Sequence, residues 1–523
     1  MKALKKNRKI QHLEGSIRDK VKSIEELSDI TKKLKLSGKT VVHAHGTFDL
    51  LHYGHLKYLE ASREYGDVLI VTITADKFVN KGPNRPVFAQ ELRAEMLAAL
   101  GIVDWVGINN HLDAVPAIRK IKPDIYAKGQ DYKNPGDDIT GKIVDETKEV
   151  EKYGGQVIFT NEDTFSSTEL LNRHFNVFEP HTRAYLKELR ENNGAKQILS
   201  GIDKIKDYSV LIIGDAIIDE YTYVHPIGKS AKENMIATRY QNNECFAGGV
   251  FATANHVASF CKHVEVVTVL GGDDSYEKLI KENLKPNVKL TAITREGAPT
   301  TRKQRFVDPG YMRKLFEVYY MNDNPLVGGL QGELNNILSK KIGDYDVVIA
   351  NDFGHGMMDL STIDMLTKHS RFLAVNCQSN SANLGYNLIT KYSRADYVCI
   401  DLPEARLAVS DKISPIEEIV GSLLPDKIDC SNFVITSGKH GCVTYQRGGV
   451  LHTIPAFSKS AIDTVGAGDA FLSVSSPLVA SGMPLNLVGL VGNVVGALKI
   501  KIVGHRESVS KTDVIKSIKS LLR

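Results

Sequence analysis

The chain has 523 residues, of which 42% are hydrophobic and 24% charged, a composition typical of soluble globular proteins. This length predicts two or three domains at about 100–200 residues each, and the small net charge of +4 excludes a strong overall attraction to nucleic acid or membranes. The six cysteines form no C-x-x-C pair and no apolar signal segment opens the chain, so we expect reduced thiols, a cytoplasmic location and no metal held by cysteine.

Residues 1–38 are predicted to form a basic, helical leader. The first 40 residues hold 12 Lys/Arg and 5 Asp/Glu, and apolar residues recur at helical spacing at Ile24, Leu27, Ile30 and Leu34. We interpret the charge as the solvated face of this helix. The alternative is that the leader contacts RNA or lipid, as part of an RNA-associated or metabolite-sensing scaffold.

A strand followed by a chemically distinctive loop begins at Val41. The strand pattern ends at Gly46, and a helical pattern follows His55. The free N–H groups at the start of such a helix attract anions. Since His52 and His55 are three residues apart, their side chains project to one side of the helix start. This pattern favours an anionic, phosphate-rich substrate over the alternative that either histidine is only a packed residue.

Strands and helices alternate onward and predict an α/β domain over residues 39–178. Strands are expected at residues 68–74, 103–108, 125–127 and 157–160, and a helix at residues 91–100. Such alternation favours a parallel sheet with helices on both faces, in which ligands collect at the carboxyl ends of the strands. The two histidines follow such an end.

The string G-T-F-D-x-x-H-x-G-H at residues 46–55 resembles the motif of the nucleotidylyltransferase superfamily. The resemblance implies a Rossmann-like fold in which His52 and His55 are catalytic and stabilise a triphosphate while a phosphomonoester attacks its α-phosphorus. It implies nucleotide- or phosphate-binding roles for Gly46, Thr47, Phe48, Asp49, Lys81, Arg93, Lys128, Asp131, Ser166, Ser167 and Thr168. Two alternatives stay open: Arg93 as a surface residue of a helix, and the hydroxyls at 166–168 as helix caps.

A polar stretch at residues 179–206 is predicted to be a linker, with a short helix at residues 184–189. A second α/β domain is expected over residues 207–523. Apolar runs predict its strands at residues 209–214, 264–270, 346–350, 372–375, 397–400 and 433–436.

The second domain contains a glycine-rich turn that opens a helix, with the sequence A-I-D-T-V-G-A-G-D-A-F at residues 461–471. Gly466 and Gly468 permit a turn whose N–H groups converge, and the helix dipole adds to their attraction for a phosphoryl group in transfer. Asp469 is placed to accept a proton from an attacking hydroxyl. The alternative is a glycine loop that is merely capped by an aspartate.

This second string resembles that of ribokinase-like carbohydrate kinases, which implies an αβα fold, Asp469 as the catalytic base and an anion hole at residues 466–468. The nucleotide- and phosphate-binding residues that the resemblance implies are Asp401, Glu404, Thr436, Gly438, Gly441, Gly466, Ala467 and Gly468. Asp401 replaces the asparagine usual in the family. The implied sugar-binding residues are Asp219, Gly248, Gly249 and, by looser alignment, Asn255. Residues 375–383 depart from related heptose kinases, which carry Asp-Pro-Lys there.

Together the halves resemble bifunctional heptose-phosphate kinase/heptose-1-phosphate nucleotidylyltransferases with the domain order inverted. The resemblance implies a Mg²⁺- and ATP-dependent sugar kinase joined to a transferase that moves a nucleotidyl group from ATP or CTP to a sugar 1-phosphate, for nucleotide-sugar and surface polysaccharide synthesis. It further implies a homodimer without nucleic-acid or membrane partners. The choice between ATP and CTP stays open. The alternative is a cytidylyltransferase for a polyol or sugar phosphate, with a kinase-like domain that binds ligand without turnover.

Overall fold

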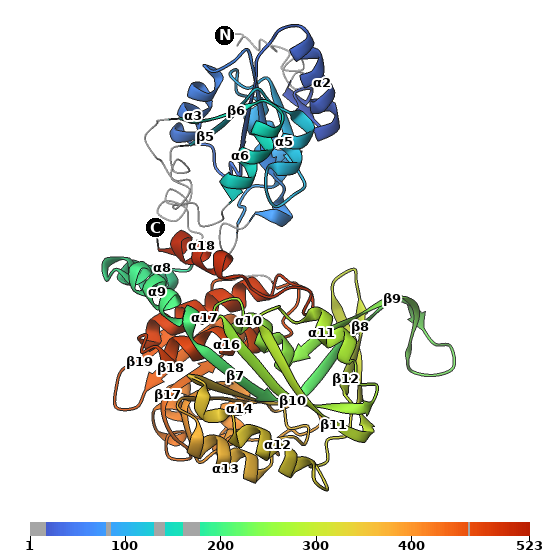
Figure 1. Cartoon of the computed structure of the whole chain (residues 1–523), viewed down its shortest axis with the longest axis vertical. Coiled ribbons are helices and arrows are strands. Elements are labelled where there is room, and N and C mark those ends of the chain that lie inside the picture. Colours follow the sequence, from blue (N-terminus) through green and yellow to red (C-terminus); the bar gives the residue numbers. More distant parts are fainter. Residues whose placement is uncertain (1–16, 80–84, 130–141, 161–177, 459–460, 523) are drawn as a thin grey trace, which may run out of the picture. The chain divides into compact units, whose positions relative to one another are not determined.

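The structure is a computed structural model that describes residues 17–79, 85–129, 142–160, 178–458 and 461–522. The chain divides into two compact units, residues 1–177 and residues 178–522, each with its own wholly or mainly parallel sheet (Figure 1). Within the described ranges, no helix combines the length and the apolar character that a membrane span needs.

The first unit contains a six-stranded sheet, in the order β1-β4-β3-β2-β5-β6, whose described strands pair in parallel. The strands are β1 (Val21–Lys22), β2 (Val41–Gly46), β3 (Val68–Thr74), β4 (Trp105–Asn109), β5 (Ile125–Gly129) and β6 (Gln156–Thr160). After β4 the chain crosses to the far side of β2, so the carboxyl end of β2 lies at the point where the strand order reverses, the usual ligand site in open sheets.

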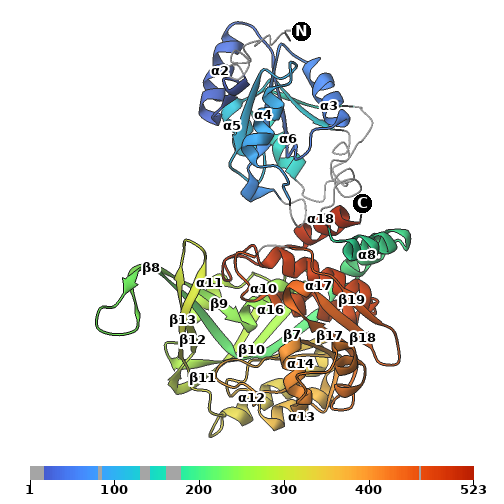
Figure 2. The ribbon, with the colours of Figure 1, turned by 180° about the vertical axis from the view of Figure 1, so that it is seen from behind.

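Helices cover both faces of this sheet (Figures 1 and 2). They are α2 (Ile24–Leu36), α3 (Tyr53–Arg63), α4 (Gln90–Ala98), α5 (Val115–Ile121) and α6 (Lys142–Lys152). Leu27 of α2 and Ile121 of α5 share one buried cluster, whereas Leu59 of α3 and Leu97 of α4 share another. Both faces are therefore closed by apolar side chains, which leaves the strand ends for chemistry.

The predicted leader helix is present as α2 and belongs to this unit. Ser23 and Glu26 form a capping box, in which each side chain accepts a hydrogen bond from the other residue's backbone N–H. The residues just before the helix pair with β4 as β1, a short strand that the sequence did not predict. The helix buries Leu27 and leaves its lysines outside, as expected for a solvated basic face.

The second unit contains a nine-stranded sheet in the order β11-β10-β7-β14-β15-β16-β17-β18-β19, parallel as far as β17 and antiparallel after it. Its strands are β7 (Ser209–Gly214), β10 (His263–Asp273), β11 (Val288–Pro299), β14 (Val347–Asp352), β15 (Leu373–Cys377), β16 (Arg394–Asp401), β17 (Asp429–Thr436), β18 (Cys442–Gln446) and β19 (Leu451–Ile454).

Two helical layers enclose this sheet (Figures 1 and 2). The first includes α10 (Val250–Val257), α16 (Ala467–Ala480) and α17 (Leu485–Lys499). The second includes α12 (Leu330–Ser339), α13 (Leu360–His369) and α14 (Leu402–Val409). The remaining helices are α8 (Pro180–Glu191), α9 (Gly194–Lys204), α11 (Glu277–Asn283), α15 (Ile416–Glu418) and α18 (Lys511–Leu521).

A separate four-stranded sheet, here called the small sheet, was not predicted from the sequence. It runs β13-β12-β8-β9 and consists of β8 (Ala216–Lys229), β9 (Ile236–Gly249), β12 (Thr301–Asp308) and β13 (Arg313–Tyr320). Its first strand follows β7 after one residue, Asp215, and its second leads directly into α10. The small sheet therefore connects to the large one at the carboxyl end of β7.

Residues 179–206, expected to be a linker, are largely helical and belong to the second unit as α8 and α9. The hydroxyl of Tyr185 donates a hydrogen bond to the carbonyl of Asn486 at 3.1 Å, and the ammonium of Lys204 donates to the carbonyl of Ser481 at 2.5 Å. Leu186, Leu189 and Ile198 are buried. The polar composition that suggested a linker is the outer face of these amphipathic helices.

Candidate functional site

The histidine motif of the first unit lies at the carboxyl end of β2 and the start of α3. His52 is the N-cap of α3, and its Nδ1 accepts a hydrogen bond from the backbone N–H of Gly54 at 3.1 Å. The rings of His52 and His55 are stacked, with centroids 3.9 Å apart. The structure thus brings the two predicted catalytic side chains together at a helix N-terminus, where anions are favoured.

The protonation of His52 follows from its surroundings. Burial lowers the pKa of His52, so its ring is neutral at physiological pH. Because Nδ1 accepts a hydrogen bond, the proton of the neutral ring resides on Nε2. A neutral imidazole with an Nε2–H donor stabilises developing negative charge on a phosphate oxygen without carrying a net charge of its own.

Gly46, the first glycine of the motif, leaves room for the ring of Phe48. Phe48 has a left-handed φ of 49° and is buried, with its ring centroid 5.0 Å from that of His55. A Cβ on Gly46 would lie 2.9 Å from Cε2 of Phe48. The motif therefore folds the loop back on itself so that Phe48 packs against the second histidine.

Two residues predicted to bind nucleotide or phosphate make contacts that hold this loop from inside. Asp49 is buried, pairs with Arg85 at 2.9 Å, and accepts hydrogen bonds from the N–H groups of Val87 and Phe88. The guanidinium of Arg93 is completely buried and makes four hydrogen bonds, to the carbonyls of Thr47, Thr74 and Phe88 and to the Asp76 carboxylate.

The burial of Arg93 excludes the alternative of an exposed residue on a helix surface. Its guanidinium donates to backbone carbonyls in the interior, and its role in phosphate binding stays a prediction. Its contact with the carbonyl of Thr47, at 2.5 Å, fixes the motif loop. Asp49 likewise positions the segment that begins at Arg85.

Lys128 and a histidine that the sequence did not single out lie at the ends of neighbouring strands. The ammonium of Lys128 is 2.8 Å from the carboxylate of Glu146. His45 Nδ1 lies 2.8 Å from the hydroxyl of Thr72, and burial, followed by the charges of Lys128 and Lys142, lowers the pKa of His45 to about 3. His45 is therefore neutral. The sequence signal that could have identified it is its spacing of two from His43, which places both side chains on one face of β2.

Lys81, Asp131, Ser166, Ser167 and Thr168 lie outside the described residues.

In the second unit, Asp469 lies in the first turn of α16, behind the glycine turn. Gly466 is the N-cap with a left-handed φ of 73°, and a Cβ there would lie 2.4 Å from Cε1 of His505, so only glycine is accommodated. Asp469 is buried, and Oδ1 accepts a hydrogen bond from the side-chain amide of Gln378 at 2.9 Å. Burial raises the pKa of Asp469, which increases its basicity.

Asp219, the predicted sugar-binding aspartate, already has two close neighbours, an arginine and a histidine. Its carboxylate contacts the guanidinium of Arg305 in β12 and lies 3.2 Å from Nε2 of His505. Although burial opposes the shift, Arg305 and His505 hold the pKa of Asp219 below its usual range. A Cβ on Gly248 would lie 2.0 Å from Oδ2 of Asp219, which explains the first glycine of the diglycine.

The side chain of Asn255, the residue suggested by looser alignment, is engaged by the end of α11 and the segment that follows it. Its side-chain oxygen accepts from the N–H of Lys285 at 2.9 Å, and its amide donates to the carbonyl of Asn283 at 2.9 Å. Both ends of the amide therefore fix the connection between α11 and β11. Gly249, by contrast, is the N-cap of α10 with a φ of 50°, beside Asp215.

Asp401 and Glu404 form a capping box at the start of α14. The Asp401 carboxylate accepts from the N–H of Glu404 at 2.8 Å, and the Glu404 carboxylate accepts from the N–H groups of Asp401 and Ser379 at 2.9 and 3.0 Å. Burial and the nearby charge of Asp401 raise the pKa of Glu404 to about 8. The substitution of asparagine by Asp401 thus keeps the cap and adds a like charge.

The predicted nucleotide loop follows β17. Gly438 and Gly441 have left-handed φ values of 52° and 90°, and a Cβ on Gly441 would lie 2.0 Å from the carbonyl oxygen of Ile454. The N–H of Ser437 donates to the carbonyl of Gly441 at 2.8 Å, which closes the loop after Thr436. The glycines are therefore required by the turn itself.

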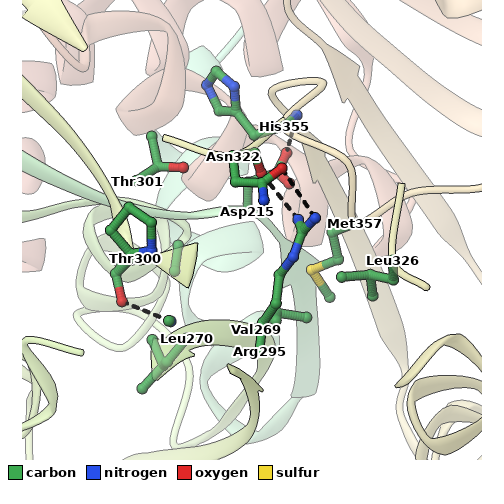
Figure 3. Close-up of a pocket in the computed structure, with 13 residues that line it drawn as sticks. Asp215, Val269, Leu270, Arg295, Thr300, Thr301, Asn322, Leu326, His355 and Met357 are labelled. Atoms are coloured by element: carbon green, nitrogen blue, oxygen red, sulfur yellow. Dashed lines mark hydrogen bonds between the residues drawn. The ribbon is translucent and has the colours of Figure 1, made fainter. Parts of the chain in front are cut away.

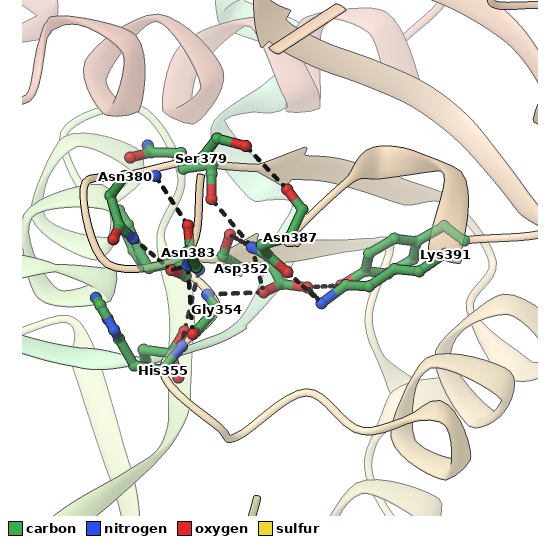
Figure 4. Close-up of polar contacts among 12 residues, drawn as sticks. Asp352, Gly354, His355, Ser379, Asn380, Asn383, Asn387 and Lys391 are labelled. Atoms are coloured by element: carbon green, nitrogen blue, oxygen red, sulfur yellow. Dashed lines mark hydrogen bonds and ion pairs between the residues drawn. The ribbon is translucent and has the colours of Figure 1, made fainter. Parts of the chain in front are cut away.

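The run that departs from heptose kinases forms a dense amide network around Asp352 (Figure 4). The buried Asp352 carboxylate binds the ammonium of Lys391 at 2.6 Å and accepts from the side-chain amide of Asn387 at 3.2 Å. The same amide donates to the carbonyl of Gln378 at 3.0 Å. The network therefore fixes Gln378, whose side chain holds Asp469.

A small polar cavity of about 30 Å³ lies where β7 and β10 end beside β12 (Figure 3). Asp215, Arg295 and His355 line it, and Asp215 accepts from the N–H groups of Phe353 and His355. Nearby, the ammonium of Lys303 lies 6.0 Å from the ring centroid of Phe353. Sequence reasoning missed Lys303 and Arg305, although their spacing of two on a strand was an available signal.

Among the described residues, no group of three or more His, Cys, Asp or Glu side chains is arranged to hold a metal ion. Carboxylate oxygens are nevertheless the ligands that Mg²⁺ prefers, and Mg²⁺ commonly binds through one or two carboxylates together with substrate phosphates. Asp401 and Glu404 are carboxylates of this kind.

Comparison with known proteins agrees with the fold. The family model "pfkB family carbohydrate kinase" matches residues 207–512, and the model "Cytidylyltransferase-like" matches residues 43–173. Because the first match covers more than half of the chain, the protein belongs to the pfkB family of carbohydrate kinases, with a cytidylyltransferase-like region ahead of the kinase region. The predicted fold classes and their order are confirmed.

Two curated relatives are bifunctional proteins. The "Bifunctional protein HldE" of Syntrophotalea carbinolica is 36% identical over 163 residues, which cover 31% of this chain and 32% of that protein. Its counterpart in Aliarcobacter butzleri is 43% identical over 139 residues, which cover 26% of this chain and 29% of that protein. The chain thus matches about a third of the length of these relatives.

Among solved structures, phosphofructokinase-2 from Escherichia coli in complex with substrates and products is 13% identical, with a TM-score of 0.49, and covers 60% of this chain and 100% of that one.

Proposed function

We propose that the protein is a bifunctional sugar activator. The second unit transfers a phosphoryl group from ATP to a sugar or sugar phosphate, and the first unit transfers a nucleotidyl group from ATP or CTP to a sugar 1-phosphate and releases pyrophosphate. The observation that carries the proposal is the buried Asp469, held by Gln378 directly behind a glycine turn. Membership of the pfkB family and the cytidylyltransferase-like match support it.

In the kinase step, Asp469 acts as the general base that accepts the proton of the attacking hydroxyl. Its raised pKa, caused by burial, brings its basicity closer to what such a transfer needs. The N–H groups at residues 466–468 and the dipole of α16 stabilise the charge on the transferred phosphoryl group. Asp219, Gly248 and Gly249, which belong to the small sheet, border the space for the sugar.

In the nucleotidyl-transfer step, His52 and His55 stabilise the triphosphate as the sugar 1-phosphate oxygen attacks the α-phosphorus. Their stacked rings place two imidazoles at the N-terminus of α3, where the helix dipole favours negative charge. Arg93, Asp49 and Phe48 act indirectly, by holding the motif loop in shape.

Mg²⁺ is proposed as the cofactor of the kinase step, held by Asp401 and Glu404 together with the phosphates of ATP. When bound it neutralises phosphate charge. A homodimer, a cytoplasmic location, and nucleoside triphosphate and sugar phosphate as the partners, without nucleic acid or membrane, complete the proposal. Synthesis of nucleotide sugars for surface polysaccharides is the role that these steps serve.

A screen of sugars and sugar phosphates against ATP and CTP tests this function. ADP and pyrophosphate are measured separately for each combination with the purified full-length chain. The proposal expects one acceptor class to yield ADP and a sugar 1-phosphate to yield pyrophosphate with one nucleotide preferred. Absence of both products across the panel would contradict it.

A second candidate is a cytidylyltransferase whose kinase-like unit binds a ligand without turnover. The contacts of Asp219 with Arg305 and His505 favour this candidate, because a sugar hydroxyl must compete with both side chains for that carboxylate. Pyrophosphate release without ADP formation, combined with saturable sugar binding to the second unit, is its signature.

A further inference from the structure

A buried lysine lies directly beneath the glycine turn of the second unit. Lys499 is the last residue of α17, and its side chain is completely buried. Its ammonium donates to the backbone carbonyls of Val465 and Gly504, each at 2.8 Å. Taking a cation out of water is costly unless strong partners replace the hydration shell, so a residue with this burial requires an explanation.

The two carbonyls belong to separate loops that Asp463 also joins. The Asp463 carboxylate accepts from the N–H of Val465 at 3.2 Å and from the N–H of Gly504 at 2.8 Å. Lys499 and Asp463 therefore close a ring of hydrogen bonds in which each loop gives one N–H and one carbonyl. The carboxylate also partly offsets the lowering of the Lys499 pKa that burial causes.

The Val465 carbonyl is linked to the turn by the geometry of the peptide group. A trans peptide is planar, so the carbonyl of one residue and the N–H of the next point in opposite directions. Lys499 binds the Val465 carbonyl from below and thereby turns the Gly466 N–H to the opposite side. No described residue accepts a hydrogen bond from that N–H, and it is the first donor of the predicted anion hole.

The Gly504 carbonyl ties a second part of the site to the same ammonium. The next residue, His505, binds Asp219 and packs against Gly466 with no room for a Cβ. One cation thus sets the position of the turn and, through a single peptide, of the histidine that touches both the turn and Asp219.

We propose that Lys499 is a positioning residue for phosphoryl transfer: its ammonium acts as an internal cation that orients the Gly466 N–H and holds the 503–505 loop against the glycine turn. It contacts neither nucleotide nor sugar. The inference rests on the proposed kinase function, and it adds a residue outside both motifs to that function.

The test compares Lys499→Met, which keeps the length of the side chain but removes its charge and donors, with Lys501→Met as the matched control. Lys501 is two residues further on, and its side chain makes no hydrogen bond or ion pair to any described residue. We expect Lys499→Met to lower kcat for ADP formation by at least about tenfold, with a KM for ATP within about threefold of wild type, since a misdirected donor affects the transition state more than binding.

Two further readouts separate positioning from loss of fold. Hydrogen–deuterium exchange of peptides covering residues 463–470 and 502–506 should accelerate in Lys499→Met and stay unchanged in Lys501→Met, while pyrophosphate release stays at the wild-type rate. In Lys499→Ala, ethylammonium should restore part of the ADP-forming rate and tetraethylammonium, which lacks N–H donors, should not. If Lys499→Met fails to fold, Lys499→Gln replaces it in the same comparison.

A folded Lys499→Met protein with wild-type kcat, or with unchanged exchange in the turn, would overturn the inference. If wild type itself forms no ADP with any acceptor, the proposed kinase function fails instead. Hydrogen exchange then decides alone: faster exchange in the turn supports the role of Lys499 as a tether, and unchanged exchange rejects it.

Discussion

At the scale of single residues, the proposed base of the second unit is held by an amide that no motif contains. Gln378 holds one oxygen of Asp469, and the network around Asp352 holds Gln378 in turn. Related heptose kinases, by resemblance, carry Asp-Pro-Lys in this region, whereas residues 375–383 of this chain contain no charged side chain. The base keeps a hydrogen bond but has no neighbouring charge from this segment to lower its pKa.

Substitution of Gln378 tests that dependence. We expect Gln378→Ala to lower kcat for ADP formation by about tenfold, a general-base effect smaller than loss of the base itself, without changing pyrophosphate release. Gln197→Ala, which removes an exposed amide of α9, is the control and should leave both products unchanged. Equal activity of the two variants would show that Gln378 does not position Asp469.

Arg93 supports a prediction about stability rather than chemistry. Arg93→Met leaves three backbone carbonyls of the first unit without their donor, so unfolding should become easier by about 3 kcal/mol or more. The exposed Arg119, paired with Glu149, is the control, and Arg119→Met should cost under about 1 kcal/mol. The single tryptophan, Trp105, lies in β4 and reports urea unfolding of this unit by fluorescence; similar midpoints for both variants would refute the assignment.

The residues predictable from sequence are those whose partners lie nearby in the chain. His52 and His55 share one helix start, and Asp469 follows its own glycine turn. Asp219 is different, because its neighbours Arg305 and His505 are about 86 and 286 positions away and no local pattern links them. The positive charge of Arg93 suggested phosphate binding, but nothing in the local sequence indicates that its side chain is buried and donates to backbone carbonyls.

At the scale of elements, strands with continuous apolar runs were predictable and strands with mixed composition were not. β3 and β7 have the predicted bounds, since both are buried on two faces. β8 and β9 are long strands, and the end of β8 and the first half of β9 are exposed to solvent. Neither alternation nor a run of apolar residues therefore marks the full length of either strand. α8 and α9 resemble a linker in the sequence because only one face of each helix is apolar and the outer face is polar.

The capping box of α14 gives a prediction about pH. Burial and Asp401 raise the pKa of Glu404 to about 8 from the ordinary value near 4.5, so the folded protein binds a proton that the unfolded chain releases. Stability of the second unit should therefore decrease as pH rises from about 4.5 to about 8. Thermal unfolding of Glu404→Gln should show a weaker pH dependence over this window; an identical slope in both proteins would refute the raised pKa.

At the scale of the whole molecule, two α/β units each present a helix start beside the carboxyl ends of parallel strands, and we propose that phosphate binds at both. His52 opens α3 in one, and the turn before Asp469 opens α16 in the other. The cytidylyltransferase-like and pfkB matches fall on these separate units. The central claim is that each unit contains a complete active site of its own.

The measurement that tests this claim most directly is a paired assay of Asp469→Asn and His52→Ala in the full-length chain, with ADP and pyrophosphate quantified in the same reactions. Asp469→Asn should reduce ADP formation by about 10²–10⁴-fold and leave pyrophosphate release unchanged. His52→Ala should do the reverse. Loss of both products in either folded variant, or of neither product in both, would contradict two independent sites.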